Sequence, residues 1–282
     1  MSAPTQCRLL IDPPCSGAWN MAVDEVLLEW AAEEGCCAWR FYGWSEPTLS
    51  LGYFQSYRDR LTHAPSLDCP AVRRLTGGGA ILHDAELTYS FAVPGGHHLA
   101  IPGTIPGGTD SLSARAASTL AEKPPVPPGR DLLYQAVHAG LIAALAEYRI
   151  AAAFCGEPGR RPPQEEPFLC FQRRTPGDVL LGGSKIAGSA QRRRRGAVLQ
   201  HGSLLLRRSP AAPELPGLEE LAQRAPAPDE LAEVWLAKLA EGLRLRWRRE
   251  SMPASRRQQV VMLSQARYAS AQWTRNRALP PR

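Results

Sequence analysis

Apolar residues in the first third of the chain follow the two periods that distinguish strands from helices. Residues 7–11 alternate in polarity and stop at a proline pair, which predicts a short strand. Helical spacing follows between Ser16, a favourable N-cap, and Gly35, a favourable C-terminal residue. The side chains expected to lie on one face of this helix are Trp19, Val23, Val26, Leu27 and Trp30.

Further short apolar runs predict strands as far as residue 93. They are separated by glycine, proline and acidic residues, and they cover 37–42, 48–52, 71–75, 80–82 and 87–93. The last three runs form a strand-rich block that is interrupted by three consecutive glycines.

The middle of the chain alternates between irregular and regular segments. Residues 94–130 are rich in proline, glycine, serine and threonine, which predicts a long loop over one face, with a possible helix at 112–120. Helical spacing then begins at Asp131, as the N-cap, and continues to Tyr148. Residues 160–167 are expected to form a second irregular connection.

The last part of the chain predicts three strands followed by helices. The strands cover 179–181, 185–191 and 197–206, and the last two form a hairpin through 192–196. Helices are expected at 229–243 and 254–270, after a proline-rich linker. The fold class is therefore α+β, an α/β sandwich with helices packed on a mixed β-sheet. We expect a catalytic domain at 1–208, and a linker with a small helical C-terminal extension at 209–282.

Composition supports a folded protein without metal. Hydrophobic residues make up 44% of the 282 residues and charged residues 21%, so the chain can bury a substantial core. Neither a signal peptide nor an apolar run of membrane-spanning length is present, which predicts a cytoplasmic protein without a membrane partner. The seven cysteines form no CxxC pair, and no HxxxH spacing occurs, so neither disulfides nor a metal site is expected.

The net charge of +6 is concentrated near the end of the chain. Residues 244–282 contain ten arginines and a single acid, Glu250. This tail is expected to meet an acidic protein partner or to be solvated. Nucleic acid is not the expected partner, because the apolar residues keep helical spacing and there are no repeated stacking aromatics. The arginines at 192–195 are expected at a solvated hairpin tip, with contact to an acidic carrier as the alternative.

The run from Arg73 to Gly79 is a candidate for binding chemistry. It places two arginines and three glycines, in the order RRLTGGG, between two predicted strands. Glycines at this place can form a tight turn whose amides face a ligand, and the arginines add positive charge, as in an anion-binding corner. The run lacks the GK[ST] of a P-loop, and three glycines also suit an ordinary turn. The nearby pair His83-Asp84 favours the binding interpretation.

An ordered set of motifs resembles the lipoate-protein ligase A and octanoyltransferase family. The motifs are NMAVDE at 20–25, FYGW at 41–44, LSLG at 49–52, RRLTGGGAILHD at 73–84, KIAGSAQ at 185–191 and QHGSLLL at 200–206. The resemblance covers roughly residues 7–208, and several motifs in order are far more specific than any one of them.

The resemblance implies a biotin-protein-ligase-like fold with an acyl-binding tunnel. The arginine-glycine loop of such enzymes covers the carboxyl end of the acyl group, and the lysine of the KIAGSA strand lies beside the reacting carbonyl. An ammonium in a partly buried site can stabilise an oxyanion, which suits Lys185. His201 has a weaker claim and is left outside the catalytic set. The residues implied to bind substrate are Arg73, Arg74, Gly77, Gly78, Gly79 and His83.

The family divides by how the acyl group is activated. ATP-dependent ligases form an acyl-adenylate, whereas octanoyltransferases carry the acyl group on a cysteine. In one transferase branch this cysteine precedes a phenylalanine shortly before the lysine motif, and Cys170-Phe171 occupies that place. The resemblance therefore implies Cys170 as the nucleophile, and Arg173, Arg174 and Lys185 would favour its thiolate. The residues after Phe171 depart from the Pro-Ser pattern of that branch, so the subclass stays open.

The implied enzyme moves an octanoyl group from octanoyl-acyl carrier protein, through a thioester on Cys170, to a lysine of a lipoyl domain. The implied acceptors are the lipoyl domains of glycine cleavage H protein or of 2-oxoacid dehydrogenase E2 subunits, and no cofactor is needed. One alternative is an ATP-dependent lipoate-protein ligase, which would use ATP and magnesium. Another is a non-catalytic acyl-carrier-binding or nucleic-acid-binding protein of the same fold.

Overall fold

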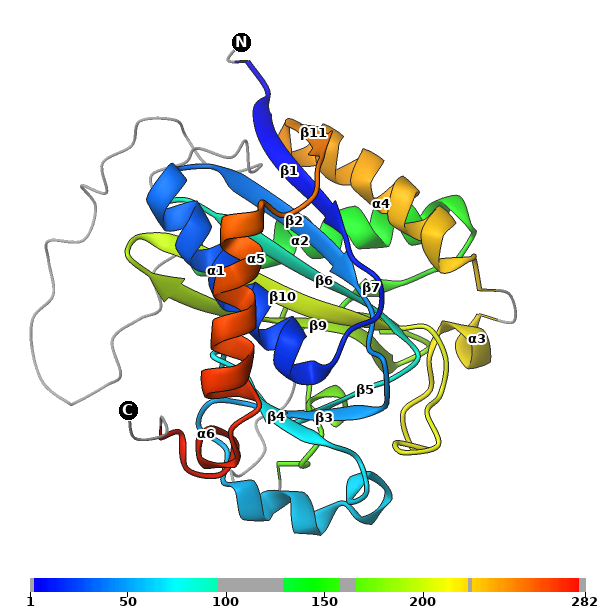
Figure 1. The fold of residues 1–282 in the computed structure, drawn as a ribbon. Coiled ribbons are helices and arrows are strands. Elements are labelled where there is room, and N and C mark those ends of the chain that lie inside the picture. Colours follow the sequence, from blue (N-terminus) through cyan, green and yellow to red (C-terminus); the bar gives the residue numbers. More distant parts are fainter. Residues whose placement is uncertain (1–2, 96–128, 158–165, 223–224, 279–282) are drawn as a thin grey trace, which may run out of the picture.

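The computed structural model describes residues 3–95, 129–157, 166–222 and 225–278 (Figure 1). Within these residues the backbone forms one large mixed sheet in the order β11-β1-β2-β6-β10-β9-β8-β7. β11, β1 and β2 are parallel, and the other neighbours are antiparallel. The strands are β1 (Thr5–Ile11), β2 (Cys37–Tyr42), β6 (Glu86–Val93), β7 (Ala153–Phe154), β8 (Val179–Leu181), β9 (Ser184–Arg194), β10 (Ala197–Leu205) and β11 (Leu245–Arg249).

A smaller sheet in the order β4-β3-β5 lies below the large one in Figure 1. Its strands are β3 (Thr48–Leu51), β4 (Ala71–Arg73) and β5 (Ile81–His83), and its apolar side chains pack against Leu169 and Phe171. The loop between β4 and β5 contains the three consecutive glycines, so the small sheet holds both ends of that loop.

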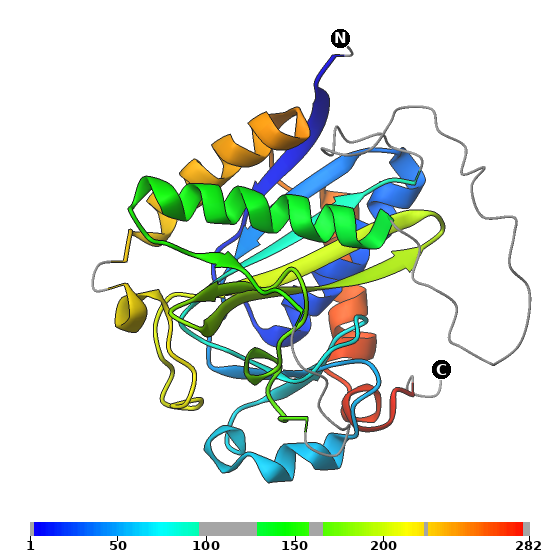
Figure 2. The same cartoon turned by 180° about the vertical axis from the view of Figure 1, so that it is seen from behind.

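Helices cover both faces of the large sheet, because the strands present apolar side chains on both faces. Figures 1 and 2 show α1 and α5 on one face, and α2 and α4 on the other. Trp39 of β2 belongs to the core under α2 and α4, whereas its neighbour Ala38 belongs to the core under α1. The helices are α1 (Gly17–Glu34), α2 (Gly129–Glu147), α3 (Leu218–Leu221), α4 (Pro228–Leu243), α5 (Ala254–Leu263) and α6 (Ala271–Asn276), with a π-helical turn at Ser264–Tyr268 after α5.

The predicted fold class, α+β with a mixed sheet and packed helices, is confirmed. The first helix has the predicted caps, since the Ser16 hydroxyl accepts a hydrogen bond from the Trp19 amide and Gly35 takes the left-handed conformation at φ 66°. α2 begins at Gly129, two residues before the predicted Asp131 cap. Most of the predicted loop at 94–130 and most of the predicted connection at 160–167 lie outside the described residues.

The C-terminal segment is less purely helical than predicted. Residues 245–249 form β11, which pairs in parallel with β1 and lengthens the large sheet by one strand. The indole of Trp273 in α6 donates to the backbone carbonyl of Arg73 at 3.1 Å, so α6 also fastens the end of β4. Residues after 208 thus pack into the same cores as the residues before them.

Within the described residues, every helix is too short or too polar to span a lipid bilayer.

Candidate active site

Lys185 lies near the start of β9, and its side chain is almost fully buried. Gly188 lies three residues further along, beyond a register shift in the β8–β9 pairing, and it makes room for the lysine: a Cβ at that position would lie 2.5 Å from Lys185 Cε and 2.8 Å from Nζ. This explains the lysine and the glycine of the KIAGSA motif together. The ammonium is thus buried at a point where the neighbouring residue Gly188 carries no side chain.

The buried ammonium has a buried counterion, Asp178. Lys185 Nζ lies 2.9 Å from Asp178 Oδ2, and both side chains are at most 4% exposed. The same carboxylate accepts hydrogen bonds from the Tyr134 hydroxyl at 2.6 Å and from the Thr175 amide at 2.8 Å. Burial lowers the pKa of Lys185, but Cys170 and Asp178 outweigh it and raise that pKa above its ordinary value. Lys185 is therefore a charged residue at neutral pH.

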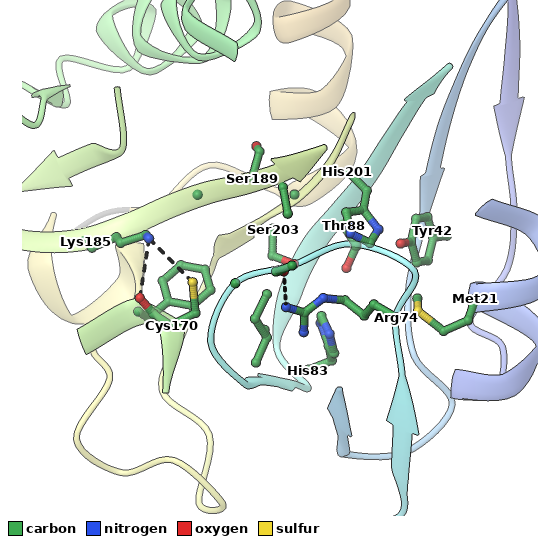
Figure 3. A pocket seen from close by; sticks show the side chains of 17 residues that line it. Met21, Tyr42, Arg74, His83, Thr88, Cys170, Lys185, Ser189, His201 and Ser203 are labelled. Atoms are coloured by element: carbon green, nitrogen blue, oxygen red, sulfur yellow. Dashed lines mark hydrogen bonds between the residues drawn. The ribbon is translucent and has the colours of Figure 1, made fainter. Parts of the chain in front are cut away.

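Cys170 lies against this ion pair. Its Sγ is 3.8 Å from Lys185 Nζ, and its backbone carbonyl is 3.4 Å from the same nitrogen (Figure 3). A short 3₁₀ turn at Cys170–Gln172 presents the thiol, and the Cys170 amide donates to the carbonyl of Ala80 at 2.7 Å. The cysteine is thus fixed from two sides, by the lysine strand and by the end of the glycine loop.

Arg74 organises the glycine loop from inside. Its guanidinium donates to the carbonyls of Gly77 at 3.0 Å and Gly79 at 2.9 Å, and to the carbonyl and hydroxyl of Ser50 at 2.8 and 2.7 Å. Burial lowers the pKa of Arg74 to about 10, which leaves it charged at neutral pH. Gly79 lies so close to Cys170 that a Cβ would come within 3.2 Å of its Cα. The arginine therefore holds the loop against the cysteine.

Arg73 has a different place from the one predicted. Its guanidinium is fully buried and donates to the carbonyls of Gly52, Gln55 and Thr274, each at 2.8 Å. It does not line the cavity beside Cys170. Successive residues in a strand point to opposite faces, so one arginine of the pair reaches the site and the other anchors α6.

The thiol and the ammonium lie where two hollows meet. One is a narrow cavity of about 40 Å³ and the other is an open groove of about 1000 Å³. In Figure 3 the narrow cavity extends from Cys170 and Lys185 on one side to Met21 and Tyr42 on the other. The residues that line both hollows are Gly77, Gly78, Cys170, Lys185, Ser189 and Ala190.

His83 lines the narrow cavity as part of a polar layer beneath the glycine loop. Its Nδ1 lies 2.5 Å from the Glu86 carboxylate, its Nε2 lies 2.6 Å from the Ser50 hydroxyl, and its ring stacks on Trp44 with centroids 3.8 Å apart. Burial lowers the pKa of His83, although Glu86 opposes the shift. The ring is therefore neutral and serves as a fixed wall of the cavity.

His201, which the sequence analysis left outside the catalytic set, also lines the cavity. Its Nδ1 lies 2.7 Å from Asp24 and its Nε2 lies 2.7 Å from the Thr76 hydroxyl, so it connects α1 with the glycine loop. Both contacts use motif residues, from NMAVDE and RRLTGGG.

A second buried histidine supports the lysine strand. His138 of α2 lies 2.7 Å from the Ser189 hydroxyl and 2.6 Å from the carbonyl of Gly177. Because a carbonyl can only accept, His138 Nδ1 carries the proton and Nε2 accepts from Ser189. Burial lowers the pKa of His138 to about 4, so it is neutral. The histidine thus connects α2, β9 and the residue before Asp178.

The structure brings together most of the predicted site residues. Cys170, Lys185, Arg74, His83 and the glycines meet around the two hollows. The two arginines expected to favour the thiolate line the open groove with Cys170, but their hydrogen bonds go to other groups: Arg173 pairs with Glu166 at 2.7 Å and Arg174 donates to the carbonyl of Gly183. Lys185 is the cation at the sulfur instead. In the described part of the chain no three metal-ligating side chains gather.

Comparisons with known proteins identify similar sequences. A family model described as the lipoyl protein ligase A/B catalytic domain matches residues 16–122 and 118–212. Octanoyltransferase LipM of Geobacillus kaustophilus is 29% identical, over 92% of this chain and 94% of that one. Octanoyltransferase LipM of Kyrpidia tusciae is 36% identical, over 73% and 68% respectively.

A similar fold occurs in a solved archaeal structure at low sequence identity. A chain from Thermoplasma acidophilum, in a structure described as a bi-partite lipoate protein ligase and its E2 lipoyl domain, aligns with a TM-score of 0.68 at 17% identity. The alignment covers 98% of this chain and 99% of that chain.

Proposed function

The chain belongs to the family of lipoyl protein ligase A/B catalytic domains, and from this premise we propose how it transfers an octanoyl group. It is an acyltransferase of lipoate metabolism, because its curated relatives at 29–37% identity are octanoyltransferases. The open question is which residues carry the acyl group and how the two protein substrates reach them.

The observation that carries the proposal is the place of Cys170, 3.8 Å from a buried ammonium at the junction of the two hollows. We place the acyl chain in the narrow cavity, which is lined by Met21 and Tyr42 on the side away from Cys170. The open groove leaves space for the chain that delivers the thioester and, later, for the lysine that receives the acyl group.

In the first step the Cys170 thiolate attacks the carbonyl carbon of an octanoyl thioester. The new S–C bond forms, the bond to the carrier sulfur breaks, and the carrier sulfur leaves as a thiolate that takes a proton from solvent. Lys185 stabilises the tetrahedral oxyanion. It keeps its positive charge in this buried place because Asp178 is its counterion.

In the second step the neutral amine of the acceptor lysine attacks the Cys170 thioester. The amide bond forms, the S–C bond breaks, the attacking nitrogen releases its proton to solvent, and Cys170 leaves as a thiolate. Lys185 again faces the oxyanion and stabilises the thiolate that is regenerated. We take the donor to be octanoyl-acyl carrier protein. The acceptor is a lipoyl domain, such as those of glycine cleavage H protein or 2-oxoacid dehydrogenase E2 subunits.

The ATP-dependent ligase is not the favoured alternative. A ligase that forms an acyl-adenylate needs no thiol at the reacting carbonyl, whereas here Cys170 faces the cavity beside Lys185. The relatives named octanoyltransferase favour thioester exchange as well.

One incubation tests the donor. The purified enzyme is given a lipoyl domain and either octanoyl-acyl carrier protein without ATP, or free lipoate with ATP and magnesium, and the acceptor is weighed by intact mass spectrometry. We expect an octanoyl adduct with the first donor and no adduct with the second. Modification that depends on ATP would contradict the proposal.

A further inference from the structure

Four consecutive arginines, at 192–195, lie at the end of β9 and in the turn that follows it. Their side chains go to two different surfaces. Arg194 and Arg195 pair with Glu29 of α1 at 2.8 and 3.1 Å. Arg192 and Arg193 instead line the open groove. The hairpin tip is therefore fastened to α1 by its last two arginines, and this contact holds the first two on the wall of the groove.

The cations nearer the reacting sulfur are already engaged. Arg173 pairs with Glu166 at 2.7 Å and donates to the carbonyl of Pro167 at 2.6 Å, while Arg174 donates to the carbonyl of Gly183. The catalytic lysine has its own aspartate. Arg173 thus has a carboxylate partner, whereas Arg174, which also lines the groove, is engaged by a backbone carbonyl.

Arg192 and Arg193 are in a different position. The guanidinium carbon of Arg192 lies 5.6 Å from the ring centroid of Tyr53, and the side chain of Arg193 is exposed. Among the residues that the structure describes, neither arginine pairs with a carboxylate, unlike Arg194 and Arg195. Each guanidinium offers planar N–H donors that suit a phosphate ester, and both arginines line the open groove although they occupy successive positions of β9.

The distance from the reacting atoms fits a particular anion. Arg192 lies seven positions after Lys185 in β9, which corresponds to about 23 Å of extended strand. The pantetheine arm that holds an acyl thioester on a carrier is an extended chain of comparable length, and it ends in a phosphate diester. With the thioester at Cys170, the arm can lie along the groove so that its phosphate reaches the two arginines.

We propose that Arg192 and Arg193 bind the phosphate of a phosphopantetheine thioester while its acyl carbonyl lies at Cys170. This inference rests on the proposed function, since it assumes that a carrier thioester is the donor. It assigns the docking of the donor to the β9–β10 hairpin.

The arginines of the C-terminal segment are placed less favourably. Those of β11 lie at the opposite end of the large sheet, with β1, β2, β6 and β10 between β11 and β9. Of the helical arginines, Arg256 pairs with Glu33 at 2.7 Å and with Glu34 at 3.1 Å, and Arg267 pairs with Glu25 at 2.5 Å. The expectation that this tail meets an acidic partner stays a prediction, and the hairpin is the donor surface proposed here.

The test compares three octanoyl donors in single-turnover acylation of the full-length enzyme, followed by intact mass. The donors are octanoyl-acyl carrier protein, octanoyl-4′-phosphopantetheine and octanoyl-pantetheine, and the last lacks the phosphate. We expect the double variant R192S/R193S to lose about tenfold in second-order rate constant with the first two donors, the scale of two exposed ion pairs. The rate with octanoyl-pantetheine should not change.

The control is R246S/R249S, which removes two exposed arginines from β11 and should leave all three rates unchanged. A loss confined to the carrier would overturn the phosphate assignment and place the contact on the carrier's folded body. Equal losses with all three donors, or no loss with any, would also overturn it. If wild-type enzyme were acylated by none of the donors, the proposed function itself would fall, which is a separate result.

Discussion

At the scale of residues, the site is a thiol, an ammonium and a carboxylate in a row. Cys170 Sγ, Lys185 Nζ and Asp178 Oδ2 are joined by distances of 3.8 and 2.9 Å. A buried ammonium without a counterion would lose its proton, because burial disfavours the charged form. Asp178 prevents this, and Tyr134 and Thr175 in turn satisfy the carboxylate. The carboxylate is therefore a positioning residue that keeps Lys185 charged toward the reacting carbonyl.

The variant Asp178→Asn tests this role. Removing the carboxylate lowers the pKa of Lys185, so Lys185 loses its charge at a lower pH and the alkaline limit of acylation moves to lower pH. The rate of acyl-enzyme formation at neutral pH should fall by up to roughly a hundredfold, the scale of one lost oxyanion donor. The fold should also lose roughly 3 kcal/mol, as expected when one partner of a buried ion pair is removed.

The measurement is the pH profile of Cys170 acylation by octanoyl-pantetheine, which avoids titration of the acceptor lysine. Asp178→Glu keeps the charge and should restore the alkaline limit. Tyr134→Phe removes a donor but no charge, and it should not move that limit. A profile of Asp178→Asn parallel to that of the wild type would show that the aspartate is only structural.

The sequence predicted the two central residues of the site but missed their partner. Cys170 and Lys185 were found because each lies in a motif, whereas Asp178 lies between motifs. A signal was present: Gly182 and Gly183 adopt φ of 55° and 81°, and such a glycine pair predicts a tight hairpin. Folding the chain at that turn brings Asp178 back to the lysine strand. Arg73 and Arg74 were both predicted to bind substrate because both lie in the motif. Only the alternation of side chains at the end of β4 directs Arg74 to the site and Arg73 away from it.

At the scale of elements, the glycine loop depends on contacts with the small sheet. The Tyr53 amide donates to the carbonyl of Thr76 at 2.7 Å, and the Arg74 amide donates to the carbonyl of Leu51 at 3.0 Å. Gly52 lies between these contacts, and a Cβ on it would lie 2.0 Å from the carbonyl oxygen of Gly78. The end of β3 and the loop can approach this closely only because Gly52 has no Cβ.

Gly52→Ala should therefore displace the loop from Cys170 and reduce acylation at least tenfold. The overpacking should cost about 1–3 kcal/mol of stability. Gly242→Ala in α4 is the matched control, because a Cβ there meets nothing within 4 Å. It should leave acylation unchanged and add up to about 1 kcal/mol of stability. Measured rates and thermal unfolding of both variants check this, and normal acylation by Gly52→Ala would mean that the loop position does not matter.

Among the elements, β11 was missed although its pattern was present. Leu245 is buried and Trp247 is half-buried on the core side, whereas Arg246 and Arg248 are exposed between and after them. The alternation covers only five residues, three of which are arginines, and it lies between two predicted helices. The strand was therefore not recognised from the sequence. The hairpin β9–β10 was predicted correctly, but its arginines pair with α1 and line the groove, which requires knowing that α1 lies beside the tip.

At the scale of the whole molecule, the order of the strands was beyond the sequence. Local periodicity predicts most of the strands. The parallel pairing of β1 with β11 joins residues 5–9 to residues 245–249, and no local pattern encodes that contact. The same closure brings Arg267 and Tyr268 to Glu25 of α1, at 2.5 and 2.8 Å. The C-terminal segment thus holds α1, which supplies Met21 to the cavity wall.

The central proposal is that the octanoyl group passes through Cys170. The most direct measurement is to expose the enzyme to octanoyl-acyl carrier protein without ATP, quench it, digest it and locate the adduct by tandem mass spectrometry. Cys36→Ala and Cys155→Ala should keep the adduct, and Cys170→Ala should lose it together with transfer. The account predicts octanoyl on Cys170 that discharges to a lipoyl-domain lysine at least as fast as steady-state turnover. Octanoylation of the acceptor by Cys170→Ala, or an adduct on another residue, would contradict it.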